Sequence, residues 1–239
     1  MKTKSVKFRV IAIALLSAAM PFKAKAQDKV EASVGADLVS NYIWRGTDCG
    51  GVSIQPSMGV SYKGLSLAAW GSVGIDKEDA REIDLTLGYT TGGFNVSVTD
   101  YWFSYHKEDG GYTGDYFKYG AHSTIHIFEA TLGYDFGPLA LSWNTYFAGD
   151  DYTKENGDRA YSTYVGISAP FKLGGLDWSA EVGLTPWEGA YANKFNVTNL
   201  TLKAEKEIKF TNSFSLPTFA QVTFNPHTQG AYFVFGVSF

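Results

Sequence analysis

The chain has 239 residues and a formal net charge of −4, and 45% of its residues are hydrophobic. A single cysteine, Cys49, excludes an internal disulfide, so the fold must close without covalent links between its elements. Fifteen tyrosines, 17 phenylalanines and 26 glycines, in a chain with few helix signals, indicate one all-β domain.

The first 26 residues have the order of a cleavable secretory signal peptide. Basic residues lie between Lys2 and Arg9, an apolar run follows from Val10 to about Met20, and Ala24-Lys25-Ala26 forms a small-x-small cleavage site. The apolar run is too short for a helix that crosses a bilayer. We therefore expect a signal peptide at residues 1–26 and one mature domain at residues 27–239.

Removal of the signal peptide makes the protein acidic. Six basic residues leave with it, so 14 basic and 24 acidic residues remain and the net charge becomes −10. Such a chain is a poor partner for nucleic acid. If it encloses a pore, its charge favours cations over anions.

Polar and apolar residues alternate along the mature chain with the period of β-strands. In residues 52–62, for example, Val, Ile, Met and Tyr occupy even positions, while Ser, Gln and Gly occupy odd ones. In chain order, the predicted strands cover residues 30–44, 52–62, 65–74, 82–89, 94–103, 121–134, 139–147, 161–171, 176–186, 195–207, 214–224 and 231–239. Most of these twelve segments have the length that a tilted strand needs to cross a bilayer.

Short and long connections alternate between these strands. Compact turns are expected at residues 63–64, 90–93, 135–138 and 172–175, and longer polar loops at 75–81, 104–120, 148–160 and 187–194. This asymmetry is typical of bacterial outer-membrane barrels, whose longer loops face outward. An even number of strands then places both termini in the periplasm.

The last predicted strand keeps its apolar stripe up to Phe239, the final residue. A soluble domain rarely leaves such a strand at its terminus, whereas a closed barrel in lipid gives it a neighbour on each side. A C-terminal aromatic residue also resembles the terminal signature of bacterial outer-membrane barrels. We therefore predict a single antiparallel transmembrane β-barrel of about twelve strands. A secreted β-sandwich is the alternative.

The alternation also assigns side chains to the two faces of the barrel. Residues expected to face lipid include Leu85, Val96, Leu141 and Val165, and residues expected to face the lumen include Thr86, Ser97 and Ser142. Outward aromatic residues near strand ends should form interfacial girdles. They are Tyr42, Trp44, Tyr62, Tyr89, Phe94, Trp102, Tyr134, Phe147, Tyr161, Phe171 and Phe239.

The segment Ser40-Asn41-Tyr42-Ile43-Trp44-Arg45-Gly46 resembles the first-strand signature Ser-Asp-Tyr-x-x-Arg-Gly of the TorF-type porins. Asn41 replaces the usual Asp of this signature, which removes one charge beside Arg45. The likeness continues through residues 55–59, 64–72 and 82–89 and weakens after about Asp150. The resemblance implies a bacterial outer-membrane barrel with a porin role.

Charged residues on the inward parity form the candidate site. Arg45, Glu82 and Asp84 are expected to face one another at the outer mouth and to set its charge preference. Asp37 shares this face on the first strand, and Glu129, Glu181, Lys203 and Glu205 are expected deeper in the lumen. One interpretation is a charged lining that passes small hydrophilic solutes, with a preference for cations. The other is a packed ion network that plugs a narrow lumen, with a structural or surface-binding role for the barrel.

The sequence also bears on two further classes of function, a lipid hydrolase and a recognition surface. A lipid hydrolase needs Ser, His and an orienting third residue on one face, but strand parity turns His122 and His126 away from Ser123 and Glu129. The aromatic segment from Tyr101 to Tyr119 either forms a recognition surface or lies at the lipid–water boundary. No ligand spacing predicts a metal or another cofactor. The expected partners are outer-membrane lipid, the export and barrel-assembly machinery and small hydrophilic solutes.

Overall fold

The computed structural model describes residues 29–107, 113–121, 123–211 and 214–239, so the predicted signal peptide lies outside the described residues. The described residues form fourteen strands. They are β1 (Glu31–Val39), β2 (Tyr42–Trp44), β3 (Thr47–Gly50), β4 (Ser53–Tyr62), β5 (Leu65–Gly74), β6 (Arg81–Thr91), β7 (Phe94–Ser104), β8 (Ile127–Asp135), β9 (Ala140–Gly149), β10 (Thr163–Leu173), β11 (Leu176–Thr185), β12 (Asn196–Lys209), β13 (Ser215–Asn225) and β14 (Gly230–Ser238).

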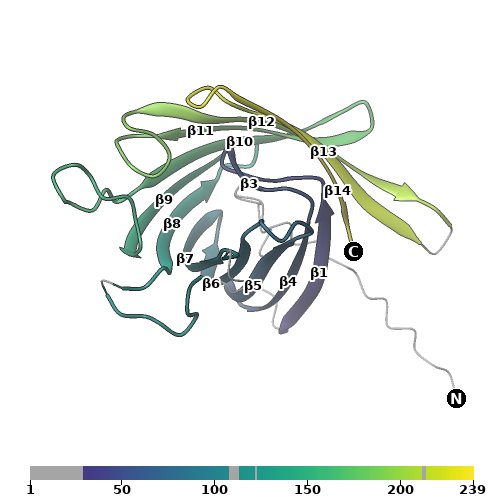
Figure 1. Ribbon diagram of the computed structural model, residues 1–239. Helices are drawn as coiled ribbons and strands as arrows, with labels where there is room; N and C mark the ends of the chain where they lie inside the picture. The colour runs from purple at the N-terminus through teal and green to yellow at the C-terminus, as the bar shows by residue number, and fades with distance from the viewer. Residues whose placement is uncertain (1–28, 108–112, 122, 212–213) are drawn as a thin grey trace, which may run out of the picture.

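Twelve of these strands close into one antiparallel barrel (Figure 1). β4 to β14 pair in sequence order, and β1 completes the ring by pairing with both β4 and β14. At the seam, Asp37 to Val39 of β1 pair with Ser238 to Gly236 of β14, so the sheet closes on itself, as a sheet that crosses hydrocarbon must. The fold predicted from the sequence is therefore confirmed.

Two of the predicted strand boundaries are wrong. The first predicted strand, residues 30–44, ends at Val39, and the remaining residues enter the separate β2–β3 sheet. The predicted strand at 121–134 begins only at Ile127, because the residues before it belong to the β7–β8 loop.

The distribution of polarity is inverted relative to that of a soluble protein. A cross-strand row of Val60, Leu67, Leu87 and Val98 crosses β4 to β7 on the outer face. Between 42% and 54% of the surface of each of these side chains is exposed. Polar residues such as Gln55, Asn144 and Gln221 are buried instead. An apolar exterior around a polar interior is the architecture of transmembrane β-barrels.

Most predicted girdle residues lie on the outer surface. Near the short turns these exposed aromatic residues are Tyr62, Tyr89, Phe94, Tyr134 and Phe171. Phe147 and Tyr161 are exposed near the opposite end. Tyr42 and Trp44 were predicted to join the girdle, and this prediction is wrong because both rings contact residues of the inner face.

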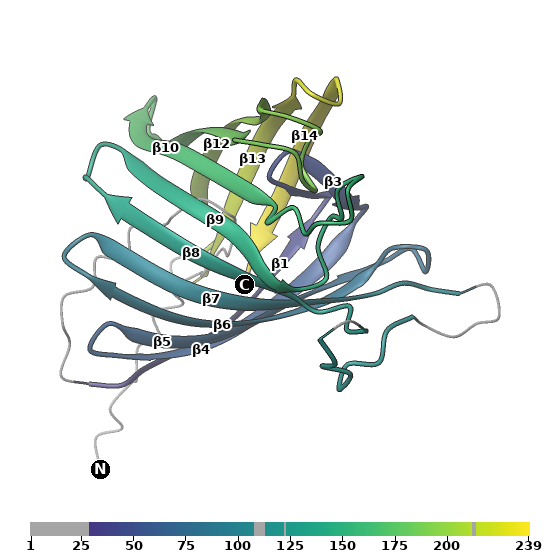
Figure 2. The ribbon, with the colours of Figure 1, turned by 90° about the vertical axis from the view of Figure 1, so that its left-hand side faces the viewer.

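The two ends of the barrel have different connections (Figure 2). Tight turns join β4 to β5, β6 to β7, β8 to β9 and β10 to β11, and residues 210–214 join β12 to β13. At the opposite end, the longer connections are residues 40–52, 75–80, 105–126, 150–162 and 186–195. We call these the short-turn end and the long-loop end. Within the described residues, no helix is long and apolar enough to cross a membrane.

Candidate functional site

The β1–β4 connection folds into the barrel as a hairpin (Figure 1). Strands β2 and β3 pair with each other, and Trp44 pairs with Thr47 across a two-residue turn made by Arg45 and Gly46. Both turn residues have positive φ angles, 52° and 81°, as a type I′ turn requires. We refer to Tyr42–Gly50 as the lumen hairpin.

Close contacts with the inner wall hold the lumen hairpin in place. Ile43 packs in an apolar cluster with Val39 and Phe219, and the amide of Asn225 donates a 3.0 Å hydrogen bond to the carbonyl of Gly46. A Cβ atom at Gly46 would lie 1.9 Å from the carbonyl oxygen of Thr198. Only glycine therefore fits this position, because the backbone conformation and the available space both exclude a side chain.

The tip of the hairpin ends in a buried ion pair. The Arg45 guanidinium donates hydrogen bonds of 2.5 and 2.9 Å to the two carboxylate oxygens of Glu129, a bidentate arrangement. Its Nη1 atom also donates a 2.5 Å hydrogen bond to the hydroxyl of Tyr191, in the β11–β12 loop. Tyr101 donates a 2.9 Å hydrogen bond to the same carboxylate. Arg45 and Glu129 are 5% and 1% exposed, so the pair is shielded from water.

Aromatic rings surround the guanidinium. Its central carbon lies 4.3 Å from the ring centroid of Trp44 and 4.8 Å from that of Tyr164. Tyr101, Tyr146, Tyr164 and Tyr191 form one buried cluster around it. Burial disfavours the charged guanidinium, but the Glu129 carboxylate and Tyr191 together raise the pKa of Arg45 well above its ordinary value. Arg45 is therefore a permanent cation held in place by its surroundings.

Two β-bulges adjoin the hairpin tip. The register of β8 and β9 shifts between Phe128 and Glu129, and Tyr146 lies opposite Glu129. The register of β11 and β12 shifts at Gly183 and Leu184, next to Thr198. Bulges re-aim side chains and bend strands, and here they shape the wall that receives Arg45 and Gly46.

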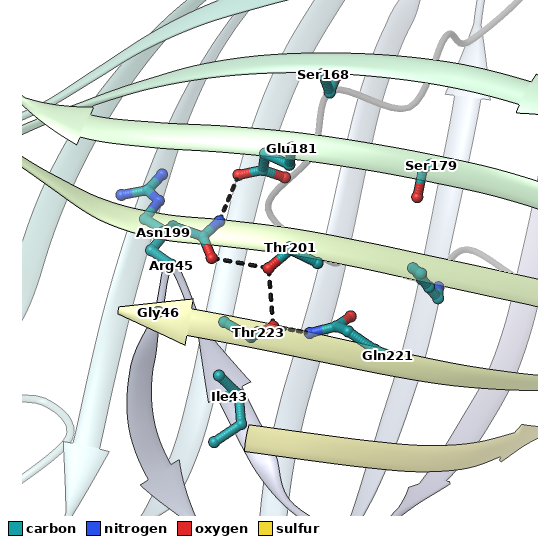
Figure 3. A pocket seen from close by; sticks show the side chains of 11 residues that line it. Ile43, Arg45, Gly46, Ser168, Ser179, Glu181, Asn199, Thr201, Gln221 and Thr223 are labelled. Carbon is teal, nitrogen blue, oxygen red and sulfur yellow. Dashed lines mark hydrogen bonds between the residues drawn. The ribbon is translucent and has the colours of Figure 1, made fainter. Parts of the chain in front are cut away.

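A polar cavity of about 40 Å³ lies beside the hairpin, against the inner faces of β10 to β13 (Figure 3). A chain of hydrogen bonds crosses its wall from Gln221 through Thr223, Thr201 and Asn199 to Glu181, with distances of 2.8 to 3.1 Å. The Thr201 hydroxyl donates to Asn199 Oδ1, so the Thr223 hydroxyl is the donor in the contact between the two threonines. All the donors are therefore directed toward the carboxylate of Glu181.

A second ion pair lies on the wall of the same cavity. The ammonium of Lys203 is 2.5 Å from the carboxylate of Glu205 and 4.4 Å from the ring centroid of Phe219. Lys203 is buried, whereas the side chain of Glu205 is 44% exposed. Asp37 also belongs to this group, since it hydrogen-bonds Ser238 and interacts electrostatically with Lys203 and Glu205.

Glu82 and Asp84 form a separate acidic pair on the inner face of β6. The Tyr42 hydroxyl, from the hairpin, hydrogen-bonds the Glu82 carboxyl. Burial and the nearby charge of Glu82 raise the pKa of Tyr42 well above its ordinary value, so this phenol remains a donor. The Tyr42 and Trp70 ring centroids are 5.4 Å apart.

The predicted site residues thus gather in three groups on the inner wall. Arg45 was expected to face Glu82 and Asp84, but the structure corrects this: its partner is Glu129, because the hairpin carries it away from the end of β1. Glu181, Lys203 and Glu205 lie on the inner wall, with Asp37 nearby. Sequence reasoning missed the roles of Tyr164, Tyr191 and Asn199. Their signal is weak, since each is one polar residue among many in strands and loops.

The histidines considered for catalysis lie elsewhere. His126 is fully buried, and its ring nitrogens contact Asp100 Oδ1 and the carbonyl oxygen of Tyr116, both at 2.7 Å. Asp100 pairs with the exposed Leu85 across β6 and β7, so this arrangement belongs to the outer wall. Both nitrogens are occupied, and Glu129 is on the inner face, so His126 lacks the free nitrogen of a general base. His122 lies outside the described residues.

Among the described residues, no group of three or more His, Cys, Asp or Glu side chains could hold a metal ion. The carboxylates of the inner wall occur singly or in pairs.

The fold and the inner wall define a transmembrane-type β-barrel whose lumen is occupied at one end by a hairpin. The sequence matches the model of a family described as "Bacterial protein of unknown function (Gcw_chp)" over residues 23–216, and the chain belongs to this family. A search of curated proteins finds no match. The resemblance to the TorF-type porins is not confirmed and stays a prediction.

Among solved structures, the chain is similar to BamA from Haemophilus ducreyi lacking POTRA domains 1–3. The TM-score is 0.38 and the sequence identity is 11%, over 82% of this chain and 41% of that chain. The chain thus spans less than half of the length of this structure.

Proposed function

We propose that the protein is a channel for small hydrophilic solutes in the bacterial outer membrane, closed at its long-loop end by the lumen hairpin in the described conformation. This proposal rests on a difference between the two halves of the inner wall. The lumen hairpin occupies the half near the long-loop end, whereas the other half has a different lining. Toward the short-turn end, inward positions carry small polar residues that remain partly exposed. They include Ser33, Ser57, Ser61, Ser97, Thr131 and Ser142. A barrel with a purely structural interior fills it with interlocking side chains instead.

The lumen hairpin is suited to be a movable obstruction. Its two strands pair only with each other and add no ladder to a barrel strand. Displacement of the hairpin would break side-chain contacts, chiefly those of Arg45 and Ile43, while the ring of twelve strands stays intact. In outer-membrane barrels the longer loops face outward, so we place the hairpin at the outer mouth and both termini in the periplasm.

The charges of the inner wall favour cations. Six carboxyl groups, those of Asp37, Glu82, Asp84, Glu129, Glu181 and Glu205, face two basic groups, those of Arg45 and Lys203. The two basic groups each neutralise one carboxylate, and the remaining acidic groups attract cations electrostatically. We also propose that the role of the protein is non-catalytic. Its proposed partners are outer-membrane lipid and the export and barrel-assembly machinery.

A permanently closed barrel with a role at its loops is the second candidate. The bidentate, fully buried Arg45–Glu129 pair favours it, because such a pair is costly to break once formed. The two candidates differ in one respect, which is whether the lumen conducts when the hairpin is absent.

Uptake by proteoliposomes distinguishes the two candidates. Val39 pairs directly with Ser53, so an Asn-Gly turn can replace residues 40–52 without strain. Liposomes with this variant should swell in isotonic solutions of small sugars. The control shortens a loop at the same end: Thr153 pairs with Arg159, so Asn-Gly can replace the mostly exposed residues 154–158. The control should behave like wild type, and an inserted hairpin-less barrel that admits no solute would favour the closed barrel.

A further inference from the structure

The polar cavity beside the lumen hairpin has a hydrogen-bond donor in its lining that lacks an acceptor. Arg45 lines the cavity, and the Nε atom of its buried guanidinium has no hydrogen-bond partner. The Nη atoms of the same group bind Glu129 and Tyr191. A buried N–H group without an acceptor carries an uncompensated desolvation cost. The cavity therefore offers this donor to a molecule that occupies it.

Glu181 presents an acceptor to the same cavity. The described donors to its carboxylate are the Tyr164 hydroxyl and the Asn199 amide, and both bind the same oxygen, Oε1. Figure 3 shows the other oxygen of Glu181, Oε2, turned away from Asn199. Since Glu181 lines the cavity, Oε2 can accept a hydrogen bond from a bound molecule.

Glu181 also lacks a cationic partner among the described residues. Arg45 binds Glu129 and Lys203 binds Glu205, although Arg45 is close enough to interact electrostatically with Glu181. A carboxylate in a confined place is stabilised by a positive charge beside it. A proton on Oε2 would remove the charge, but it would need an acceptor of its own and would leave Arg45 Nε unpaired. Protonation alone therefore does not satisfy both groups.

The volume of the cavity limits the size of its occupant. The cavity measures about 40 Å³, and one water molecule needs about 10–15 Å³ of such space. The cavity therefore has room for a molecule of about three or four non-hydrogen atoms. Hydroxyl groups of Ser168 and Ser179 contribute to its lining, which suits a hydrophilic molecule.

We propose that the cavity binds a small solute that carries an ammonium group and, two carbons away, an oxygen acceptor. The ammonium group donates to Glu181 Oε2 and neutralises the carboxylate, and the oxygen accepts from Arg45 Nε. One molecule thus satisfies both groups of the cavity. This inference names a solute class for the proposed channel and in that respect rests on the proposed function, whereas binding itself does not require conduction.

Three probes with the same number of non-hydrogen atoms separate the two contacts. 2-Aminoethanol has both the ammonium group and the oxygen acceptor. Propylamine keeps the ammonium group but has a methyl group in place of the hydroxyl, so it offers nothing to Arg45 Nε. Ethylene glycol keeps the oxygen acceptor but has no charge for Glu181. We expect 2-aminoethanol to bind most tightly, and each of the other two to bind more weakly by about tenfold or more.

The Nε–H group of Arg45 reports on binding directly by NMR. The chain has few arginines, so labelling of arginine with ¹⁵N gives few Nε–H resonances. The variants Arg9→Lys, Arg81→Lys and Arg159→Lys identify the resonance of Arg45 by elimination. In protein refolded in lipid nanodiscs, 2-aminoethanol should shift the Arg45 resonance until it saturates, and the other arginine resonances should stay in place.

A matched pair of variants assigns the binding to Glu181. Glu181→Gln should weaken the binding of 2-aminoethanol by about tenfold or more, because the contact with the ammonium group loses its charge. Asp177→Asn removes the same charge from the same face of β11, but Asp177 lies outside the cavity and binds Lys172. This control should bind 2-aminoethanol like the wild type. Equal weakening in the two variants would overturn the assignment.

The wild-type titrations decide the proposal even if Glu181→Gln does not fold. The absence of a saturable shift with 2-aminoethanol would show that the cavity holds only water and would overturn the proposal. Equal binding of the three probes would also overturn it, because neither contact would then select the solute. A silent channel would not change these outcomes, and a failure to bind 2-aminoethanol would leave the proposed channel to its own test.

Discussion

Arg45 and Glu129 are 84 residues apart in the sequence, yet the guanidinium of one makes two parallel hydrogen bonds to the carboxylate of the other inside the barrel. Arg45 is at the tip of a hairpin that pairs with no barrel strand, and Glu129 belongs to the wall. The position of the hairpin therefore depends on side-chain contacts, while the barrel itself depends on backbone ladders.

Removal of the Glu129 charge should release the hairpin. Loss of one partner of a buried ion pair costs about 3–5 kcal/mol when the other charge stays buried. In Glu129→Gln, Arg45 can avoid this cost if the hairpin leaves the wall and the guanidinium becomes hydrated. Hydrogen exchange should therefore accelerate in Tyr42–Gly50 and remain slow in the barrel strands. Glu205→Gln is the control, because that carboxylate is partly exposed and contacts Lys203 instead. Equal rates of hydrogen exchange in Tyr42–Gly50 of the two variants would show that the Arg45–Glu129 pair does not hold the hairpin in place.

A methyl group at Gly46 should have the same effect by a steric route. The new Cβ would lie 1.9 Å from the Thr198 carbonyl, and φ is 81°. Gly157 has a similar φ of 86° but open space around its Cβ position. Gly157→Ala should therefore show only the conformational cost, about 1–2 kcal/mol. Gly46→Ala should in addition expose the hairpin to proteolysis in membrane-inserted protein. If the hairpin of Gly46→Ala resists proteolysis as well as that of the wild type, the turn can move to accommodate the methyl group.

The barrel could be predicted from the sequence because each strand obeys one local rule. The alternation around Leu85 and Thr86 assigns these residues to opposite faces without knowledge of their neighbours, and exposure confirms that Leu85 faces outward. Glu129 and Glu181 were assigned to the inner wall by the same rule, and both contact other inner-wall residues.

The lumen hairpin could not be predicted from alternation, because β1, β2 and the connection between them continue the same pattern of apolar residues. Two signals were present. A strand over residues 30–44 is longer than a bilayer requires, and Arg45-Gly46 has a glycine at the second position of a two-residue turn. No signal in the sequence identifies Glu129 as the partner of Arg45. Their contact joins distant segments and depends on two β-bulges.

The assignment of faces predicts a difference between neighbouring residues. Leu85→Arg places a charge on the outer face and should destabilise the barrel by about 2–4 kcal/mol if the site is near the bilayer midplane. Thr86→Arg places the same charge in the lumen, where the main loss is the hydrogen bond to Thr99, about 1 kcal/mol. Unfolding in lipid vesicles measures both values. Equal costs would refute the assignment of the two faces.

High pH should weaken the contact between Tyr191 and the hairpin. Burial raises the pKa of Tyr191 to about 12, from an ordinary value of 10.0. A raised folded-state pKa gives a stabilisation that is complete below pH 10 and is lost as the pH rises toward 12. The free energy of unfolding should therefore fall more steeply over this range in the wild type than in Tyr191→Phe. Parallel pH profiles would show that Tyr191 titrates normally.

Planar-bilayer recording shows whether the lumen is a path that the hairpin closes. The full chain and the variant with Asn-Gly in place of residues 40–52 are inserted, and insertion is verified by protease protection. We expect closed or brief events for the wild type. For the variant we expect a steady conductance, with a reversal potential that shows a preference for cations. This preference should weaken as the salt concentration rises. A hairpin-less barrel that is inserted yet silent would contradict the proposed channel and leave a closed barrel in its place.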